Sequence, residues 1–269
     1  MGKIIAITNQ KGGVGKTTTS VNLAASLVAT KRRVLLADMD PQGNATMGSG
    51  VNKQVLEYSS YDVLMEQANI EDTLVNTGEI GYDLLPANSD LTAAEVQLLG
   101  LEQRETRLGR ALKKVSDRYD YIFIDCPPSL NMLTLNALVA AEAVMIPMQC
   151  EYYALEGLTA LVNTIEEIRS TLNPDLRIEG LLRTMYDPRN RLSGDVTIQL
   201  QKYFGDRDYR TVIPRNVRLA EAPSHGVPAL LYDKASRGAQ AYLALAGEII
   251  RREMQEQSQN SPEENAVTA

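Results

Sequence analysis

Two lysines flank a glycine-rich stretch near the start of this 269-residue chain. Residues 10–18 read Gln-Lys-Gly-Gly-Val-Gly-Lys-Thr-Thr, so Lys11 is an additional cation five residues before Lys16. Closely spaced glycines let a loop turn tightly and aim successive backbone N–H groups at a polyphosphate. The strict pattern has a glycine where this chain has Gln10. We interpret the stretch as a deviant phosphate loop, in which Lys16 contacts the β- and γ-phosphates and Thr17 ligates Mg²⁺.

Carboxylates at the ends of two predicted strands supply the remaining chemistry. Asp38 and Asp40 follow the apolar run 33–37, and Asp125 follows the run 121–124. Ligands of doubly wound sheets bind beyond the carboxyl ends of the strands. Asp125 therefore has a Walker B arrangement and is expected to hold Mg²⁺ directly or through a water, with the Pro-Pro-Ser that follows shaping a loop near the γ-phosphate. Of Asp38 and Asp40, one could face magnesium and the other the attacking water, although acids at strand ends also cap helices.

The elements that position these groups alternate along the chain. Apolar runs such as 34–36 and 121–124 lack the period-2 alternation of a half-exposed strand, which indicates strands buried on both faces of a parallel sheet. Strands are expected at residues 3–8, 33–37, 121–125, 143–148, 178–184 and 211–214. Helices are expected at residues 16–28, 61–67, 90–117, 131–141, 155–172, 192–204 and 236–254. This order predicts an α/β fold, a single-domain doubly wound and mostly parallel sheet over residues 1–254, and a polar, acidic, disordered tail over 255–269.

Cysteine, histidine and hydropathy content argue against several other classes of protein. Cys126 and Cys150 form no Cys-x-x-Cys pair, which argues against a zinc or iron–sulfur site. The single histidine, His225, lies in Ala-Pro-Ser-His-Gly, where we expect a turn or cap. No run of about 18 apolar residues could span a bilayer, and the chain starts on a strand pattern rather than a signal sequence. We therefore expect a cytoplasmic protein with no membrane partner.

The charge is unevenly distributed along the chain. The formal net charge is −7, yet residues 177–237 contain 11 Lys or Arg against 7 Asp or Glu. Within this segment Arg189, Arg191, Arg215 and Arg218 lie in loop-like stretches, from which they could reach backbone phosphates without reading bases. The alternative is surface ion pairs with nearby aspartates, namely Asp187, Asp195, Asp206 and Asp208.

Four stretches in this order resemble the ParA family of chromosome-partitioning ATPases, of the short Soj type. They are residues 11–18 (Lys-Gly-Gly-Val-Gly-Lys-Thr-Thr), 38–44 (Asp-Met-Asp-Pro-Gln-Gly-Asn), 125–129 (Asp-Cys-Pro-Pro-Ser) and 213–226 (Ile-Pro-Arg-Asn-Val-Arg-Leu-Ala-Glu-Ala-Pro-Ser-His-Gly). The likeness covers nearly the whole chain. Longer plasmid members begin with a DNA-binding helix-turn-helix domain. Because the phosphate loop here starts at residue 10, we expect the short class.

The resemblance implies a Mg²⁺-dependent ATPase that works as a nucleotide-sandwich homodimer. It implies that Lys11 reaches across the dimer to the phosphates of the other subunit, much as an arginine finger stabilises the charge of a transferring phosphoryl group. It also implies that Asp40 orients or activates the attacking water, that Asp38 assists magnesium and that Lys16 acts on the phosphates. The expected nucleotide-binding residues are Lys11, Gly12, Gly13, Val14, Gly15, Lys16, Thr17 and Thr18, with Pro214, Arg215 and Asn216 near the adenine.

The same resemblance implies the partners. Positions matching Arg189 and Arg218 bind duplex DNA without sequence preference in the ATP dimer, and we add Arg215 to this expected DNA-binding set. A ParB-like centromere-binding protein would stimulate slow hydrolysis and so release the dimer from the nucleoid. The sequence leaves open whether the cargo is a chromosome, a plasmid or a protein.

Three rival interpretations share the two-lysine loop or the nucleotide site. A MinD-like membrane ATPase would need a basic amphipathic C-terminal helix, whereas residues 253–269 contain four acids and no base. A protein similar to the nitrogenase iron protein would bridge its dimer with a cysteine-ligated cluster, for which Cys126 and Cys150 are poorly placed. A nucleotide-dependent scaffold would bind ATP without hydrolysing it, and Asp40 argues against that interpretation.

Overall fold

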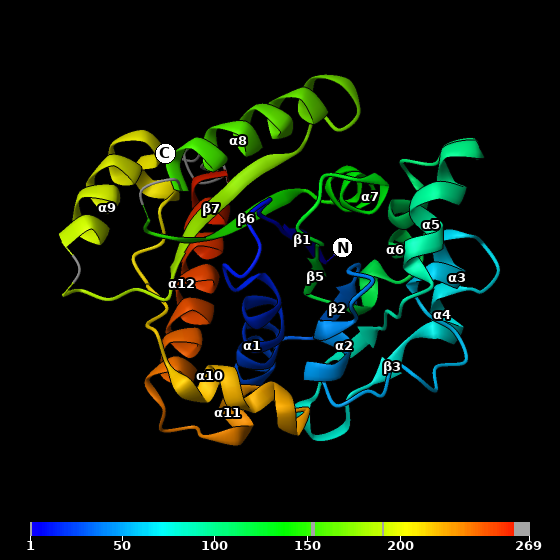
Figure 1. Cartoon of the computed structure of the whole chain (residues 1–269), viewed down its shortest axis with the longest axis horizontal. Coiled ribbons are helices and arrows are strands. Elements are labelled where there is room, and N and C mark those ends of the chain that lie inside the picture. The colour runs from blue at the N-terminus through cyan, green and yellow to red at the C-terminus, as the bar shows by residue number, and fades with distance from the viewer. Residues whose placement is uncertain (1, 152–153, 190, 261–269) are drawn as a thin grey trace, which may run out of the picture.

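The chain folds around a single seven-stranded sheet. The computed structural model describes residues 2–151, 154–189 and 191–260. The strands lie in the order β3-β4-β2-β5-β1-β6-β7, with helices on both faces (Figure 1). The strands are β1 (Lys3–Ile7), β2 (Val34–Asp38), β3 (Val75–Asn76), β4 (Asp83–Leu85), β5 (Tyr121–Asp125), β6 (Ala143–Gln149) and β7 (Arg177–Thr184). Only the edge pair β3–β4 is antiparallel among the described strands. The predicted doubly wound, mostly parallel α/β sheet is confirmed.

Helices connect the strands and cover the sheet. They are α1 (Lys16–Ala29), α2 (Asn44–Gly48), α3 (Ser60–Leu64), α4 (Ile70–Thr73), α5 (Leu91–Gln97), α6 (Arg107–Lys113), α7 (Met132–Ala140), α8 (Ala154–Thr171), α9 (Arg191–Phe204), α10 (Val217–Glu221), α11 (Ala229–Tyr232) and α12 (Arg237–Asn260). Short 3₁₀ turns stand at Gly78–Ile80, Leu98–Gly100, Ser116–Arg118, Gly205–Arg207 and Ala222–His225. In Figure 1, α1 and α12 run side by side, and their residues pack against each other.

Two apolar cores sandwich the sheet. Side chains of successive strand residues point to opposite faces, so Ile4 and Ala6 of β1 join one core whereas Ile5 and Ile7 join the other. The first core includes buried residues of α5 through α9, and the second includes those of α1 and α10 through α12. The central strands are therefore buried on both faces, which explains their continuous apolar sequences. Because β1, β2 and β5 are parallel neighbours, their carboxyl ends lie together at the same end of the strands. The site is built there.

Two sequence-based expectations for elements were wrong. Residues 90–117 do not form one helical stretch, because α5 ends at Gln97 and α6 begins only at Arg107. Between these helices Gln103 adopts a left-handed φ of 50°, which a continuous right-handed helix cannot contain. Residues 211–214 form no named strand, and Pro214 makes one isolated parallel bridge to Tyr186. A proline lacks the N–H that a longer ladder would require.

The boundary between the domain and its tail also shifts. Helix α12 continues to Asn260, six residues beyond the expected end at residue 254, so residues 255–260 are helical rather than disordered. Residues 261–269 lie outside the described residues. Within the described ranges, no helix is long and apolar enough to cross a membrane.

Candidate nucleotide site

The phosphate loop joins the end of β1 to the start of α1. Gly13 and Gly15 have φ values of 72° and 89°, in the left-handed region that residues with a side chain rarely adopt. A Cβ added at Gly12 or Gly13 would meet nothing within 4 Å, so the outer side of the loop is open. Val14 is buried beneath it. The loop therefore offers backbone N–H groups and the positive end of α1 to an anion, as predicted.

Lys16 lies at the first position of α1 and is largely buried. Its Nζ donates a hydrogen bond to the carbonyl oxygen of Lys11 at 3.2 Å. Burial lowers the pKa of Lys16, and the nearby charge of Asp125 opposes that shift. The ammonium group is thus held under the loop next to negative charge, where phosphate oxygens would be its natural additional partners.

Two carboxylates lie behind the loop on adjacent strands. Asp38 and Asp125 are opposite each other in the parallel register of β2 and β5, and both are fully buried. Asp125 accepts hydrogen bonds from Thr17 Oγ1 at 2.8 Å and from Ser20 Oγ at 2.7 Å. Asp38 accepts from the backbone N–H of Thr46 at 2.8 Å and from Thr46 Oγ1 at 2.7 Å. The structure therefore brings together all three predicted magnesium residues, Thr17, Asp38 and Asp125.

The electrostatics of this pair suit a divalent cation. Burial raises the pKa of Asp125, and the neighbouring charge of Asp38 raises it further. Burial also raises the pKa of Asp38, although its hydrogen bonds with Thr46 oppose the shift. Two carboxylates and a threonine hydroxyl are the hard oxygen donors that Mg²⁺ prefers. The residues present therefore fit the metal that the sequence predicts.

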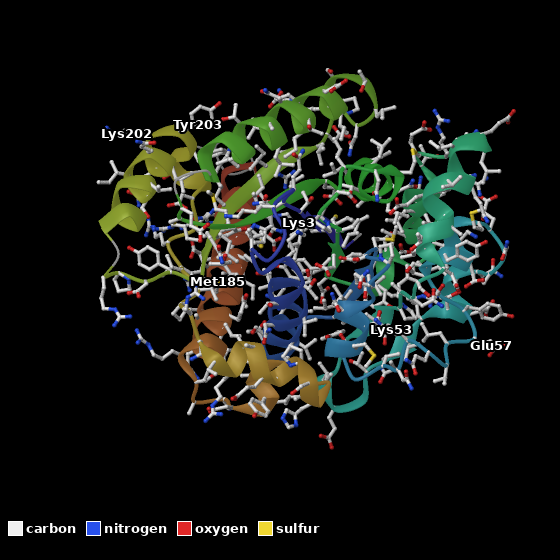
Figure 2. The ribbon with its side chains drawn as sticks, in the orientation of Figure 1. Lys3, Lys53, Glu57, Met185, Lys202 and Tyr203 are labelled. Atoms are coloured by element: carbon white, nitrogen blue, oxygen red, sulfur yellow. The ribbon has the colours of Figure 1, made fainter. Side chains whose placement is uncertain are left out.

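Asp40 occupies the wall of a cleft of about 610 Å³ in front of the loop. Three segments, around Gly12–Thr18, Asp40–Asn44 and Pro127–Ser129, supply most of the lining of this cleft, and Thr92, Glu95 and Met185 supply the rest. The Oδ1 of Asp40 accepts a hydrogen bond from the backbone N–H of Gln42 at 2.9 Å. Lys53, labelled in Figure 2, reaches back and donates to the Gln42 carbonyl oxygen. Asp40 thus reaches the space in front of the phosphate loop, whereas Asp38 stays behind it.

Gly43 explains the shape of the segment that carries Asp40. Gly43 has a φ of 56°, and a Cβ there would lie 2.7 Å from the carbonyl oxygen of Ala87. Only glycine fits both the conformation and the space. The Gly that follows the acidic pair in sequence therefore holds the segment carrying Asp40 against the sheet.

Sequence comparisons place the chain in a known family. A family model described as an AAA domain matches residues 2–178. The sporulation initiation inhibitor protein Soj of Bacillus subtilis (strain 168) is 57% identical over 93% of this chain and 98% of its own length. The chromosome partitioning protein ParA of Caulobacter vibrioides (strain NA1000 / CB15N) is 51% identical over 95% of this chain and 97% of its own length. This chain belongs to the ParA/Soj family of ATPases.

The fold comparison agrees with this assignment. A crystal structure of cobyrinic acid a,c-diamide synthase from Mycobacterium smegmatis, with bound ADP and magnesium, has a TM-score of 0.83 and 39% sequence identity to this ParA-family chain. It covers 95% of this chain and 97% of its own. The predicted family, fold class and ATPase activity are therefore confirmed.

The second lysine of this ParA-family ATPase lies outside its own cleft. Lys11 is not among the residues that line the cleft in the described part of the chain. Its Nζ forms an ion pair with Glu151 Oε2 at 2.5 Å, and 45% of its side-chain surface is exposed. Its backbone N–H is held by Asn9 Oδ1 at 2.9 Å. The partner Glu151, 140 residues away in sequence, could not be found from the sequence pattern.

The predicted adenine segment lies apart from this cleft. Pro214, Arg215 and Asn216 are absent from its lining among the described residues. Asn216 is the N-cap of α10, where its Oδ1 accepts from the Arg218 N–H at 3.0 Å. The structure shows a structural role for Asn216, and the expected contact with adenine remains a prediction.

The predicted DNA-binding arginines Arg189, Arg215 and Arg218 are exposed, and Arg189 and Arg218 are already paired with acids. Arg189 forms an ion pair with Asp187 at 2.8 Å, one of the pairs that the sequence left open. Arg218 pairs instead with Glu221 at 2.8 Å and Asp233 at 3.3 Å. The side chain of Arg191 lies outside the described residues. Exposed pairs of this kind contribute little to stability and can exchange for phosphate.

The two cysteines are buried in the protein interior, and the histidine lies in a turn. Cys126 and Cys150 are 1% and 5% exposed, so neither sulfur stands on a surface that a second subunit could share. This burial adds to the argument against a cluster that bridges two subunits. His225 ends a 3₁₀ turn, as predicted, and its ring stacks on Tyr232 with centroids 4.8 Å apart.

Sequence reasoning missed two hydroxyl groups that complete the site. Ser20 and Thr46 hold the buried carboxylates of Asp125 and Asp38, respectively. Ser20 lies one helical turn after Lys16, so the spacing along α1 could have indicated that it faces the same way. Thr46 gives no such local signal, because its position depends on how α2 packs beside β2.

Proposed function

We propose that this ParA-family ATPase is a nucleotide switch for DNA segregation. ATP binding drives a nucleotide-sandwich homodimer, the dimer binds duplex DNA without sequence preference, and slow hydrolysis releases it. One observation carries the proposal. The phosphate loop has a second lysine that lies outside the cleft of its own subunit and is held at the surface by Glu151. A cation placed there is available to a second copy of the site.

The residues around the cleft support a hydrolytic role. The loop N–H groups and Lys16 would bind the β- and γ-phosphates of ATP, and Thr17, Asp125 and Asp38 would hold Mg²⁺. When bound, the metal neutralises charge on the phosphate oxygens. Asp40, on the cleft wall, accepts a hydrogen bond from the attacking water and orients it toward the γ-phosphate. Because the Asp40 segment is fixed by Gly43 and Lys53, this orientation is set before the substrate binds.

Lys11 would act on the partner subunit's phosphates. To do so it must leave Glu151, and that exposed pair contributes only about 0–1 kcal/mol. A phosphate group carries more negative charge than a carboxylate and accepts several hydrogen bonds, so the exchange is favourable when ATP is bound opposite. Dimerisation therefore depends on the nucleotide, and the charge stabilisation of the transition state depends on the dimer.

DNA binding is assigned to Arg189, Arg215 and Arg218. All three side chains are exposed, and Arg189 is 89% exposed. Arg189 and Arg215 lie on loop segments, and Arg218 lies in the five-residue helix α10 (Val217–Glu221). None of the three lies on a helix long enough to read bases in a groove, which favours phosphate contact over base readout. Two copies in a dimer would double the number of cations facing one duplex. This proposal includes association with the nucleoid.

A partner that stimulates hydrolysis completes the cycle. The relatives named Soj and ParA support a role in chromosome partitioning, and we propose a ParB-like centromere-binding protein as the stimulating partner. The alternatives are a MinD-like membrane-positioning role and the positioning of a protein cargo. The first would bind lipid vesicles with ATP, and the second would bind DNA without responding to ParB.

The deciding experiment measures duplex DNA binding with no nucleotide, with ADP and with ATP. It is repeated for Lys16→Ala and Lys11→Ala, with Lys113→Ala on α6 as the control for loss of an exposed lysine. We expect binding only with ATP, its loss in both loop variants and no change in the control. Binding that ignores the nucleotide would refute the switch, and ATP-dependent binding to anionic vesicles instead of DNA would favour the membrane role.

A salt titration tests the arginines directly. If four of the six proposed arginines in a dimer contact phosphates, log affinity should fall against log salt with a slope of about −3 to −4. Arg218→Ala should weaken binding and flatten this slope. Arg169→Ala on α8 is the matched control, because it also removes an arginine from an exposed i,i+3 pair with a glutamate. Equal binding by both variants would remove Arg218 from the DNA surface.

A further inference from the structure

The end of β7 is tied directly to the phosphate loop. Thr184 Oγ1 donates a hydrogen bond to the carbonyl oxygen of Val14 at 2.7 Å, and both residues are buried. A Cβ built on Gly15 would also touch the Thr184 side chain at 3.8 Å. β6 separates β7 from β1 in the sheet, so no ladder hydrogen bond connects these two strands. The Thr184 hydroxyl is therefore a specific side-chain link between the loop and a strand two places away.

The residue after Thr184 lies on the wall of the nucleotide cleft. Met185, labelled in Figure 2, lines the same cleft as Lys16 and Asp40. Its φ is 49°, a left-handed conformation that costs a residue with a side chain conformational energy. Its sulfur lies against the side-chain amide of Gln149. A nucleotide bound in the cleft would therefore lie next to Met185, the residue whose backbone is strained.

Immediately after Met185, Tyr186 connects the segment that carries Arg189 to the segment that carries Arg215. The Tyr186 N–H donates to the Ile213 carbonyl oxygen at 3.0 Å, and the Ile213 N–H donates to the Arg183 carbonyl oxygen at 2.8 Å. Tyr186 also forms the isolated bridge to Pro214. These bonds on either side of Thr184 and Met185 fasten the segment before Arg215 to the segment before Arg189.

Charge joins the two segments further out. Asp187 accepts hydrogen bonds from the guanidinium and the backbone N–H of Arg189, and these bonds, with a smaller contribution from the charge of Arg215, lower the pKa of Asp187 to about 2. Arg189 is thus paired with Asp187, and the charge of Arg215 acts on the same carboxylate. Because of the backbone bonds at Tyr186 and Ile213, a shift at the end of β7 would move both arginine segments together.

We propose that Thr184 is a positioning residue that couples occupancy of the phosphate loop to the placement of Arg189 and Arg215. This inference rests on the proposed DNA-binding function of those arginines and adds the path by which ATP controls it. Phosphates on the loop fix the Val14 peptide, the Thr184 hydroxyl follows it, and Met185 carries the change to Tyr186. Coupling of this kind is reciprocal, so DNA must also raise the affinity for ATP.

The first test compares Thr184→Val, which keeps the shape but loses the hydroxyl donor, with Thr184→Ser, which keeps the donor. For each full-length variant, DNA dissociation constants are measured with ADP and with a non-hydrolysable ATP analogue, and ATP affinity is measured with and without DNA. We expect Thr184→Val to reduce the ratio of the two DNA constants at least fivefold and to weaken the reciprocal effect on ATP. Thr184→Ser should retain both within about twofold. Any ratio in Thr184→Val that matches the wild type overturns the proposal, as does an equal loss in Thr184→Ser.

A second measurement does not depend on DNA. Amide hydrogen exchange of residues 186–189 and 213–218 is followed with and without the ATP analogue. We expect slower exchange on nucleotide binding in the wild type and in Thr184→Ser, but not in Thr184→Val. The same response in all three proteins would refute the coupling. If the wild type binds no DNA in any nucleotide state, the proposed function fails, and the exchange pattern alone decides whether Thr184 links the loop to the arginines.

Discussion

Replacing Asp125 by asparagine should stabilise the nucleotide-free protein at neutral pH. Asp125 and Asp38 are fully buried on neighbouring strands, and burial with the charge of Asp38 raises the pKa of Asp125 from 3.8 to about 7. One pKa unit corresponds to about 1.4 kcal/mol, so ionising this carboxyl in the folded protein costs up to about 4 kcal/mol. Asparagine carries no charge and keeps an oxygen acceptor for one of the two hydroxyls, which donate to different oxygens of Asp125, whereas the other hydroxyl must turn to accept from the amide NH₂. We expect a gain of about 1–4 kcal/mol in the free energy of unfolding at pH 7.5.

The pH dependence gives the sign of the effect. Because the pKa is raised in the folded state, the folded protein holds more protons than the unfolded chain between about pH 4 and pH 7. The free energy of unfolding of the wild type should therefore fall as the pH rises through this window, and the fall should be complete above about pH 7. Asp125→Asn should show a shallower fall, so that the two proteins differ less at pH 5 than at pH 7.5. Mg²⁺ with ATP should stabilise the wild type more than the variant.

Urea denaturation at pH 5 and pH 7.5, with and without Mg²⁺ and ATP, measures these differences. Asp175→Asn, which removes an exposed loop carboxylate, is the matched control and should leave the pH dependence unchanged. If Asp125→Asn destabilises the nucleotide-free protein by the same amount at both pH values, the electrostatic argument for the paired carboxylates is wrong.

Three further predictions follow from single contacts. Glu151→Gln frees Lys11 from an exposed ion pair, so the ATP-dependent dimer should tighten by up to about fivefold in sedimentation analysis, and a weaker dimer would contradict this reasoning. Gly180→Ala places a Cβ 2.7 Å from both the backbone carbonyl oxygen of Arg207 and the Tyr209 ring and should cost about 1–3 kcal/mol in urea denaturation, whereas an unchanged midpoint would show that this segment shifts to accept the methyl group. Tyr242→Phe removes a buried hydroxyl pair with α1 and should cost about 0.5–1.5 kcal/mol, with full stability contradicting the importance of that pair.

The phosphate loop and the strand tips could be predicted because their signals are local. Glycines at fixed spacing, Lys16 and Thr17 follow one another in the chain, and Asp125 follows directly on an apolar strand. The backbone geometry of a strand, loop and helix then places these groups without help from distant residues. The central strands were equally clear, since burial on both faces requires continuous apolar runs.

Elements that depend on packing against distant segments were harder to predict. The short strands β3, at one edge of the sheet, and β4, next to it, carry too few residues to show a period. Residues 211–214 have strand-like composition, yet only one bridge to Tyr186 forms there because Pro214 interrupts the donors. The additional turns of α12 beyond residue 254 are polar, and composition alone favoured a disordered tail.

The sequence by itself determined the chemistry of the site, since an ATP-binding loop and its metal carboxylates are encoded by residue type and short spacing. Only the tertiary structure decided which groups meet across the sheet. Asp38 and Asp125 face each other because β2 and β5 are neighbours, and Lys11 meets Glu151 across 140 residues of chain. Thr184, at the end of β7, reaches Val14 in the loop after β1 across 170 residues, although β6 lies between these two strands. The physical reason is that covalent geometry fixes contacts within a few residues, whereas long-range contacts follow from how the two apolar cores order the strands and helices.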